Sequence, residues 1–181
     1  MIHFIPASLR LHSFNRQLAR MAVEYLEGQA EVHFLSFEDL PYMNQDLEYP
    51  VPEAVARVRN EVLDADLIWI FTQEYNYSYP GLLKNLLDWL SRPANPTDRK
   101  SQSVLAEKKA AISGAAGASA AGKARAKLRE LLELVGVEVL PEETGVVLGK
   151  EAFMTDVLTL TPEEEAALRT EAEAVLITLE K

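Results

Sequence analysis

The chain has 181 residues, of which 48% are hydrophobic, and its formal net charge is −10. This length suits one compact domain with a full core, so we predict a single domain over residues 1–181. The acidic balance argues against nucleic acid and anionic membranes as partners, and the absence of cysteine excludes disulfides, thiolate catalysis and cysteine-ligated metals.

The first half of the chain alternates short apolar runs with amphipathic segments. Residues 2–6 and 32–37 have the pattern of strands, and residues 67–71 (LIWIF) form the most continuous apolar run, which is typical of a strand buried on both faces. Apolar residues recur at helical spacing over residues 14–26 and 52–63. Gly28 and Pro52 supply a helix end and a helix start there.

The second half continues the alternation. A helix opens at Pro80 and Gly81 and runs to residue 90, and a polar, proline-containing connection follows over residues 91–107. Residues 109–113 and 137–140 are predicted strands, and the helix between them ends at Gly136. The sequence TPEE at residues 161–164 is a capping box that begins a last helix, which extends to residue 179.

This strand–helix order, repeated five times, predicts an α/β fold. We expect a three-layer sandwich in which a five-stranded parallel sheet carries helices on both faces. Met1 leads directly into an apolar run without a basic region, and no segment approaches the ~20 apolar residues of a membrane helix, so we expect a cytoplasmic protein. Ligands of such sheets bind at the carboxyl ends of the strands, which draws attention to the loops after the first, third and fourth strands.

The first loop, PASLRLHSFN at residues 6–15, concentrates hydrogen-bond donors before a helix. Ser8, Ser13 and Asn15 lie close to the helix start, where exposed amides and the helix dipole favour an anion. Arg10 adds a guanidinium suited to phosphate. The competing interpretation is that Ser13 only caps the helix and that Arg10 is an ordinary surface charge.

The other two loops have compositions that suit a flat ring. Residues 72–85, TQEYNYSYPGLLKN, combine tyrosines with amide groups; the competing interpretation is that Tyr77, Tyr79 and Trp89 form oligomer contacts. Residues 113–122 contain only Ser, Gly and Ala, which let a ligand lie close to the backbone, although a flexible linker would have the same composition. The histidines are scattered without metal-ligand spacing, so we expect no metal site.

These loops resemble the NADPH-dependent FMN reductase family, a flavodoxin-like group that includes quinone, azo-dye and chromate reductases. The first loop is similar to the family's G-S-x-R-x-x-S-x-N phosphate loop. The second is similar to its long signature T-P-E-Y-N-x-S-x-P-G-x-L-K-N-x-x-D-W. The similarity extends from residue 2 to about residue 140, and it implies a flavodoxin-like fold for this chain.

The resemblance also implies a cofactor and the residues that hold it. The phosphate and ribityl chain of non-covalently bound FMN would contact Ser8, Arg10, Ser13, Phe14 and Asn15. The flavin ring would be bordered from the second loop by Gln73, Glu74, Tyr75, Asn76 and Tyr77, and from the third loop by Ser113 and Gly117. The family further implies homodimers or homotetramers, with the flavin near a subunit interface.

The implied activity is a ping-pong reaction in which NAD(P)H reduces the flavin and a small acceptor then takes the electrons. The acceptor would be a flavin, quinone, azo dye or metal oxyanion, and no catalytic side chain is named because the flavin carries the chemistry. Lys123 and Arg125 are candidates to meet a 2′-phosphate of NADPH.

Three departures from the family pattern keep other functions open. Ala7 replaces a glycine, Gln73 replaces a proline, and Ala120-Ala121 stand where a glycine pair is common. These departures motivate a flavin-free binding module as one alternative. A non-enzymatic electron carrier like flavodoxin is the other, and the acidic surface would suit docking of such a carrier to a redox partner.

Overall fold

A computed structural model of the chain describes residues 1–95, 98 and 101–180. Four residues of the connection predicted over 91–107, namely 96, 97, 99 and 100, therefore lie outside the described residues. The strands are β1 (Ile2–Pro6), β2 (Val32–Phe34), β3 (Leu67–Thr72), β4 (Lys109–Ala116) and β5 (Glu138–Val147). The helices are α1 (Phe14–Tyr25), the 3₁₀ helix η1 (Gln45–Leu47), α2 (Glu53–Asp64), α3 (Gly81–Leu90), α4 (Gly122–Leu134), α5 (Lys150–Thr155) and α6 (Pro162–Leu179).

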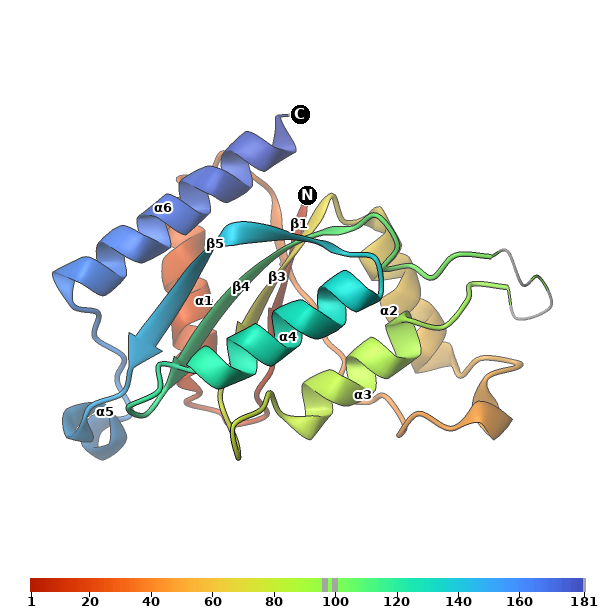
Figure 1. Cartoon of the computed structure of the whole chain (residues 1–181), viewed down its shortest axis with the longest axis horizontal. Helices are drawn as coiled ribbons and strands as arrows, with labels where there is room; N and C mark the ends of the chain where they lie inside the picture. The colour runs from red at the N-terminus through yellow and green to blue at the C-terminus, as the bar shows by residue number, and fades with distance from the viewer. Residues whose placement is uncertain (96–97, 99–100, 181) are drawn as a thin grey trace.

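The five strands form one sheet in the order β2-β1-β3-β4-β5, and every pair of neighbours is parallel. Helices α2, α3 and α4 pack on one face of the sheet, and α1 and α6 pack on the other (Figure 1). This arrangement confirms the predicted α/β sandwich with its parallel sheet. Within the described part of the chain, no helix is both long and apolar enough to cross a lipid bilayer.

The central strand β3 supplies both halves of the core. All six of its residues are buried. Because side chains alternate along a strand, Ile68 and Ile70 face α2, α3 and α4, whereas Trp69 and Phe71 face α1 and α6. The continuous apolar run in the sequence therefore reflects burial on both sides, as predicted.

Four strands differ in length from the prediction, although β3 gains only Thr72. β2 ends at Phe34 rather than at residue 37, while β4 continues three residues further, to Ala116. β5 extends to Val147, past Pro141, which lies where the register with β4 shifts between Val139 and Glu143. The short helix α5 was not predicted at all.

Trp89 corrects one expectation from the sequence. The competing interpretation of the second loop placed this side chain at an oligomer contact, but it is 0% exposed in the folded chain. Its indole N–H donates to the carbonyl of Pro41 at 2.8 Å, and the Asn85 amide donates to the same oxygen at 2.9 Å. The prediction was wrong because the segment around Pro41 folds over α3, a long-range contact that helical spacing does not reveal.

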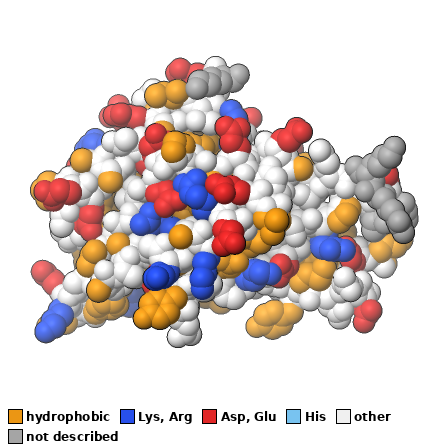
Figure 2. All heavy atoms as spheres, in the orientation of Figure 1, with side chains coloured by type: hydrophobic (Ala, Val, Ile, Leu, Met, Phe, Trp, Pro, Cys, Tyr) orange, Lys and Arg blue, Asp and Glu red, His pale blue; other side chains and the backbone are white. Residues whose placement is uncertain are grey.

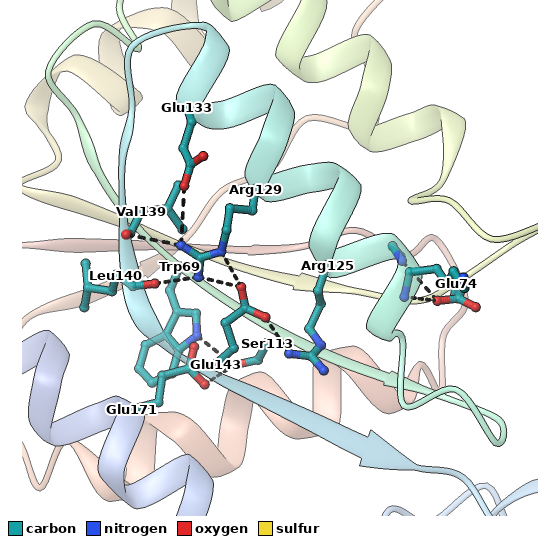
Figure 3. Close-up of polar contacts among 12 residues, drawn as sticks. Trp69, Glu74, Ser113, Arg125, Arg129, Glu133, Val139, Leu140, Glu143 and Glu171 are labelled. Atoms are coloured by element: carbon teal, nitrogen blue, oxygen red, sulfur yellow. Dashed lines mark hydrogen bonds and ion pairs between the residues drawn. The ribbon is translucent and has the colours of Figure 1, made fainter.

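A buried polar chain lies between α6 and the sheet (Figure 3). The Trp69 indole N–H donates to the Ser113 hydroxyl at 2.9 Å, and that hydroxyl donates to Glu171 Oε2 at 2.8 Å. Burial raises the pKa of Glu171 to about 8, despite the opposing effect of the Thr144 and Ser113 hydroxyls. The carboxyl therefore holds its proton at neutral pH, which avoids a buried charge.

Glu171→Gln is expected to stabilise the protein increasingly as the pH rises from 5 to 8. In this window the folded chain keeps a proton on Glu171 that the unfolded chain has lost, so the free energy of unfolding of the unmodified protein falls with rising pH. The variant removes this slope, which amounts to at most about 1.4 kcal/mol per pH unit. Chemical denaturation at several pH values measures it. The exposed Glu173→Gln on the same helix is the control, and an equal response of both variants would contradict the assignment.

Candidate functional site

A cavity of about 360 Å³ opens at the carboxyl ends of β1, β3 and β4. Its volume falls within the range of small-molecule sites, roughly 300–1,000 Å³. Nine of the twelve residues predicted from the sequence line it: Ser8, Arg10, Ser13, Phe14, Asn15, Gln73, Glu74, Tyr75 and Gly117. The other lining residues are Ala115, Ala116, Leu148 and Phe153. The fold thus brings most of the predicted residues together, from three loops that are far apart in the sequence.

The first loop is tied to the sheet by Asn15. Its side-chain amide donates to the carbonyl of Ala115 at 3.0 Å, and its oxygen accepts from the Ala115 amide at 2.8 Å. The Asn15 side chain is buried, so this pair of bonds fixes the start of α1 against the end of β4. Ser13 caps α1 by accepting from the Arg16 amide at 3.4 Å, a long and weak bond, and it also lines the cavity.

Arg10 is held by three neighbours rather than projecting freely into solvent. Its guanidinium forms an ion pair with the carboxylate of Asp156 and donates to the carbonyl of His12 at 2.9 Å. It also lies 5.2 Å from the ring centre of Phe14, a cation–π distance. Arg10 is thus a partly exposed charge that lines the cavity and whose guanidinium is already paired.

Helix α5 forms one wall of the cavity, and the sequence analysis missed it. Phe153 packs edge-on against Phe14 with ring centres 5.7 Å apart. Gln17 of α1 holds the residues after α5: its amide donates to the Asp156 carbonyl at 2.9 Å, and its oxygen accepts from Leu158 at 2.8 Å. The available signal was the apolar pair Phe153-Met154 within an otherwise polar segment, but one helical turn gives no periodicity.

The tip of the second loop is a tight turn outside the cavity. Tyr75 and Ser78 exchange backbone hydrogen bonds of 2.9 and 3.0 Å, and the two residues between them, Asn76 and Tyr77, both have positive φ. This sign pattern is that of a type I′ turn. Asn76 and Tyr77 do not line the cavity, and Tyr77 is 67% exposed. Flavin contacts for these two residues stay predictions.

Glu74 connects the second loop to the third. One of its carboxylate oxygens accepts from the backbone amides of Lys123 and Ala124, at 2.9 and 3.0 Å (Figure 3). These amides belong to the first turn of α4, whose N-cap residue Ala121 makes no side-chain cap. A carboxylate there also interacts favourably with the helix dipole. Glu74 therefore caps α4 from a distance, which the sequence alone did not suggest.

The third loop turns tightly at Ala120 and Ala121, with φ of 47° and 56°. This left-handed conformation favours glycine, so the alanine pair departs from the family pattern at a small cost in backbone strain. The turn packs closely on the sheet: a Cβ added to Gly114 would lie 2.6 Å from the Thr72 carbonyl oxygen and 2.8 Å from Ala121 Cβ. Gly114 thus serves packing of the chain itself.

Ser113 does not line the cavity. The residue is 0% exposed, and its hydroxyl belongs to the buried chain with Trp69 and Glu171. Its position follows from the length of β4, which continues beyond it to Ala116, so the loop that reaches the cavity begins later than expected. A flavin contact by Ser113 stays a prediction, and its position in the structure gives it no support.

Arg125 is already engaged, contrary to the expectation that it could meet a 2′-phosphate. Its guanidinium donates to Glu143 at 2.6 Å, and the side chain is only 17% exposed. The same carboxylate also binds Arg129, so the pair belongs to a network on α4 and β5 (Figure 3). Lys123 remains accessible, with its ammonium 6.0 Å from the Tyr77 ring centre.

The cavity fits a flavin nucleotide in its donor and acceptor groups. Gln73 lines the cavity, and its Oε1 is a buried acceptor without a hydrogen-bond partner among the described residues. Arg10, Ser8 and the start of α1 lie together at the first loop, where they suit a phosphate. The aromatic and small residues of the remaining wall suit a planar ring.

Comparisons with known proteins agree with this chemistry. A family model described as NADPH-dependent FMN reductase matches residues 1–151. A 2-hydroxy-1,4-benzoquinone reductase of Burkholderia is 38% identical over 71% of the chain and 67% of its own length. An NAD(P)H:quinone oxidoreductase of Solanum tuberosum is 36% identical over 68% of the chain and 62% of its own length. The chain thus spans about two thirds of these curated relatives.

One solved structure matches nearly the whole chain. The flavoenzyme NAD(P)H:(acceptor) oxidoreductase FerB of Paracoccus denitrificans superposes with a TM-score of 0.83 and 33% sequence identity. The superposition covers 99% of this chain and 96% of that one, so it includes α5 and α6, which lie largely beyond the matched family segment.

Glu74→Ala is expected to lower the free energy of unfolding by about 1–2 kcal/mol, because two amides at the start of α4 lose their acceptor. Glu74→Gln should lose less, since an amide oxygen still accepts from them. Urea denaturation measures both variants. Lys123→Ala is the control, because it changes a side chain in the same turn but keeps the backbone amide, and a loss of equal size in this control would contradict the capping role.

Proposed function

The chain belongs to the NADPH-dependent FMN reductase family, and from this premise we propose that it binds FMN non-covalently in the cavity and passes electrons from NAD(P)H to a small acceptor. The observation that carries the proposal is the cavity itself. It joins a cationic loop at a helix start with an aromatic loop, in which Gln73 Oε1 is buried without a partner among the described residues. We assign the whole activity to one domain, residues 1–181.

The first loop would hold the phosphate of FMN. Arg10 provides charged donors, Ser8 and Ser13 provide hydroxyl groups, and the start of α1 adds the positive end of a helix dipole. Such local groups outweigh the net acidic charge within a small cavity, because a contact at hydrogen-bond distance is screened far less than distant surface charges. Asn15 would act indirectly, by fixing this loop to β4.

The second and third loops would orient the ring. Glu74 ties the second loop, which carries Gln73 and Tyr75, to the first turn of α4, which follows the third loop. Bound FMN supplies the electron-transfer chemistry, as flavins do in oxidoreductases. The chain then needs only to bind, orient and exclude water, so no side chain is assigned a proton-transfer role.

Quinones are the acceptor class that we propose first, because both curated relatives are named as quinone-reducing enzymes. The enzymatic function is favoured over a flavodoxin-like electron carrier for the same reason. A flavin-free binding module is less well supported, since the phosphate-binding donors are intact and the departures Ala120 and Ala121 fold into a well-packed turn.

A cytoplasmic location stays a proposal drawn from the sequence, as does the exclusion of nucleic acid and membranes as partners.

The purified protein is expected to bind FMN more tightly than FAD, because one compact phosphate loop leaves no evident place for an adenosine group. Fluorescence quenching of each flavin measures this preference. Addition of NADPH or NADH without oxygen should then bleach the visible absorbance of the bound flavin, and a benzoquinone should restore it. Failure of both nucleotides to bleach a bound flavin would favour the electron carrier, and failure to bind any flavin would refute the proposal.

Self-association is a further part of the proposal, with the cavity mouth as the contact surface. Tyr75 and Tyr77 of the second loop and Phe153 of α5 are all more than half exposed. Figure 2 shows hydrophobic side chains along the lower edge, where Figure 1 places these loops, with basic side chains beside them. Exposed aromatic residues grouped in this way are typical of interface centres.

Light scattering over a dilution series at moderate salt is expected to show a dimer or tetramer. Tyr77→Ser should shift the equilibrium toward monomer, because it removes an exposed aromatic side chain without touching the core. Tyr42→Ser, which removes an aromatic side chain that is also exposed but lies outside the cavity, is the control. A monomer at every concentration would reject the interface while leaving the flavin assignment intact.

A further inference from the structure

Asp156 lies beside the expected phosphate site but outside the segment that defines the family. Its carboxylate forms an ion pair with the guanidinium of Arg10, the one arginine that lines the cavity among the described residues. Asp156 itself follows α5, five residues beyond the last residue matched by the family model. The family match, which implies that Arg10 binds phosphate, therefore does not include the carboxylate that pairs with Arg10.

The position of Asp156 is fixed by its backbone. The residue has a left-handed conformation with φ of 58°, its amide donates to the Ala152 carbonyl at 2.8 Å, and its own carbonyl accepts from the Gln17 side chain at 2.9 Å. The edge-on contact of Phe153 with Phe14 holds α5 against the same loop. Backbone contacts of this segment therefore position the short side chain of Asp156 beside Arg10.

The ion pair by itself is a weak source of stability. The two side chains are 48% and 40% exposed, and exposed pairs of this kind contribute little to folding. Its effect on an anionic ligand is different. A phosphate monoester carries about −1.5 to −2 charges at neutral pH, so the nearby carboxylate would repel it while occupying the donors of the guanidinium.

We propose that Asp156 sets the phosphate selectivity of the flavin site, because its carboxylate competes with the phosphate of FMN for Arg10. This inference rests on the proposed binding of FMN. It implies that Asp156 weakens the binding of FMN below what the donors of the first loop would allow. The binding affinity of a flavin without a phosphate is affected much less, because it does not compete for Arg10. The flavin would then exchange with free flavin instead of remaining permanently bound.

The test compares FMN with riboflavin, which lacks the phosphate, in the Asp156→Asn variant. Asparagine tolerates the left-handed conformation, so the backbone after α5 is preserved. Fluorescence quenching should show that FMN binds about three- to tenfold more tightly, which matches the usual size of one partly exposed charge interaction, while riboflavin affinity is unchanged. Asp39→Asn is the matched control, because it breaks another exposed aspartate–arginine pair, with Arg57, and changes the net charge equally.

A double-mutant cycle separates competition from other effects. In an Arg10→Ala background, which should itself weaken FMN binding about ten- to a hundredfold, Asp156→Asn should lose most of its effect on FMN. Unchanged FMN binding by Asp156→Asn alone would overturn the inference, since the carboxylate would then not compete with the phosphate. Weaker FMN binding would also overturn it, since the carboxylate would then orient Arg10 for the phosphate. Equal tightening of FMN and riboflavin would also overturn it and would indicate a looser α5.

The outcomes distinguish this inference from the proposed function. If the unmodified protein binds FMN and the ratio of FMN to riboflavin affinity does not respond to Asp156→Asn, only the role of Asp156 fails. If neither the unmodified protein nor any variant binds either flavin, the proposed function fails and the inference fails with it.

Discussion

The parallel pairing of β1 with β3 is the constraint on which the site depends. The chain leaves β1, forms β2 at one edge of the sheet, and crosses back to place Ile2 opposite Leu67. The loops after β1 and β3 therefore leave neighbouring strand ends while their helices go to opposite faces of the sheet. The opening between these loops is where the cavity lies.

The opening becomes a shaped site because side chains bond to the backbone of other loops. Asn15 ties the first loop to β4 through both polar atoms of its amide, and Glu74 ties the second loop to the start of α4. Asn15 hydrogen-bonds to the backbone carbonyl and amide of Ala115, and Glu74 accepts from backbone amides in the first turn of α4. A cavity held in this way is preorganised, so ligand binding need not order the walls and loses less conformational entropy.

The electrostatics of the site are local, although the chain carries a net charge of −10. Arg125 is neutralised by Glu143, and Arg10 by Asp156, so both arginines have lost part of their attraction for anions. The two pairs differ in burial: Arg125 is mostly covered, whereas the Arg10 pair is open to solvent and to the cavity. The proposed competition between a carboxylate and a phosphate therefore concerns the Arg10 pair.

The alternation of apolar runs and amphipathic helices determined the α/β sandwich, because a parallel strand such as β3 that is buried on both faces has a continuous apolar run such as LIWIF. The loop compositions likewise pointed to the strand ends and to Arg10, and the family resemblance added Gln73 and Gly117. Only the tertiary structure decided that Trp89 is a core residue and that Asp156 pairs with Arg10. Both outcomes depend on contacts between segments far apart in the chain, and a local pattern carries no information about which distant backbone will cover a side chain or which charge will reach it.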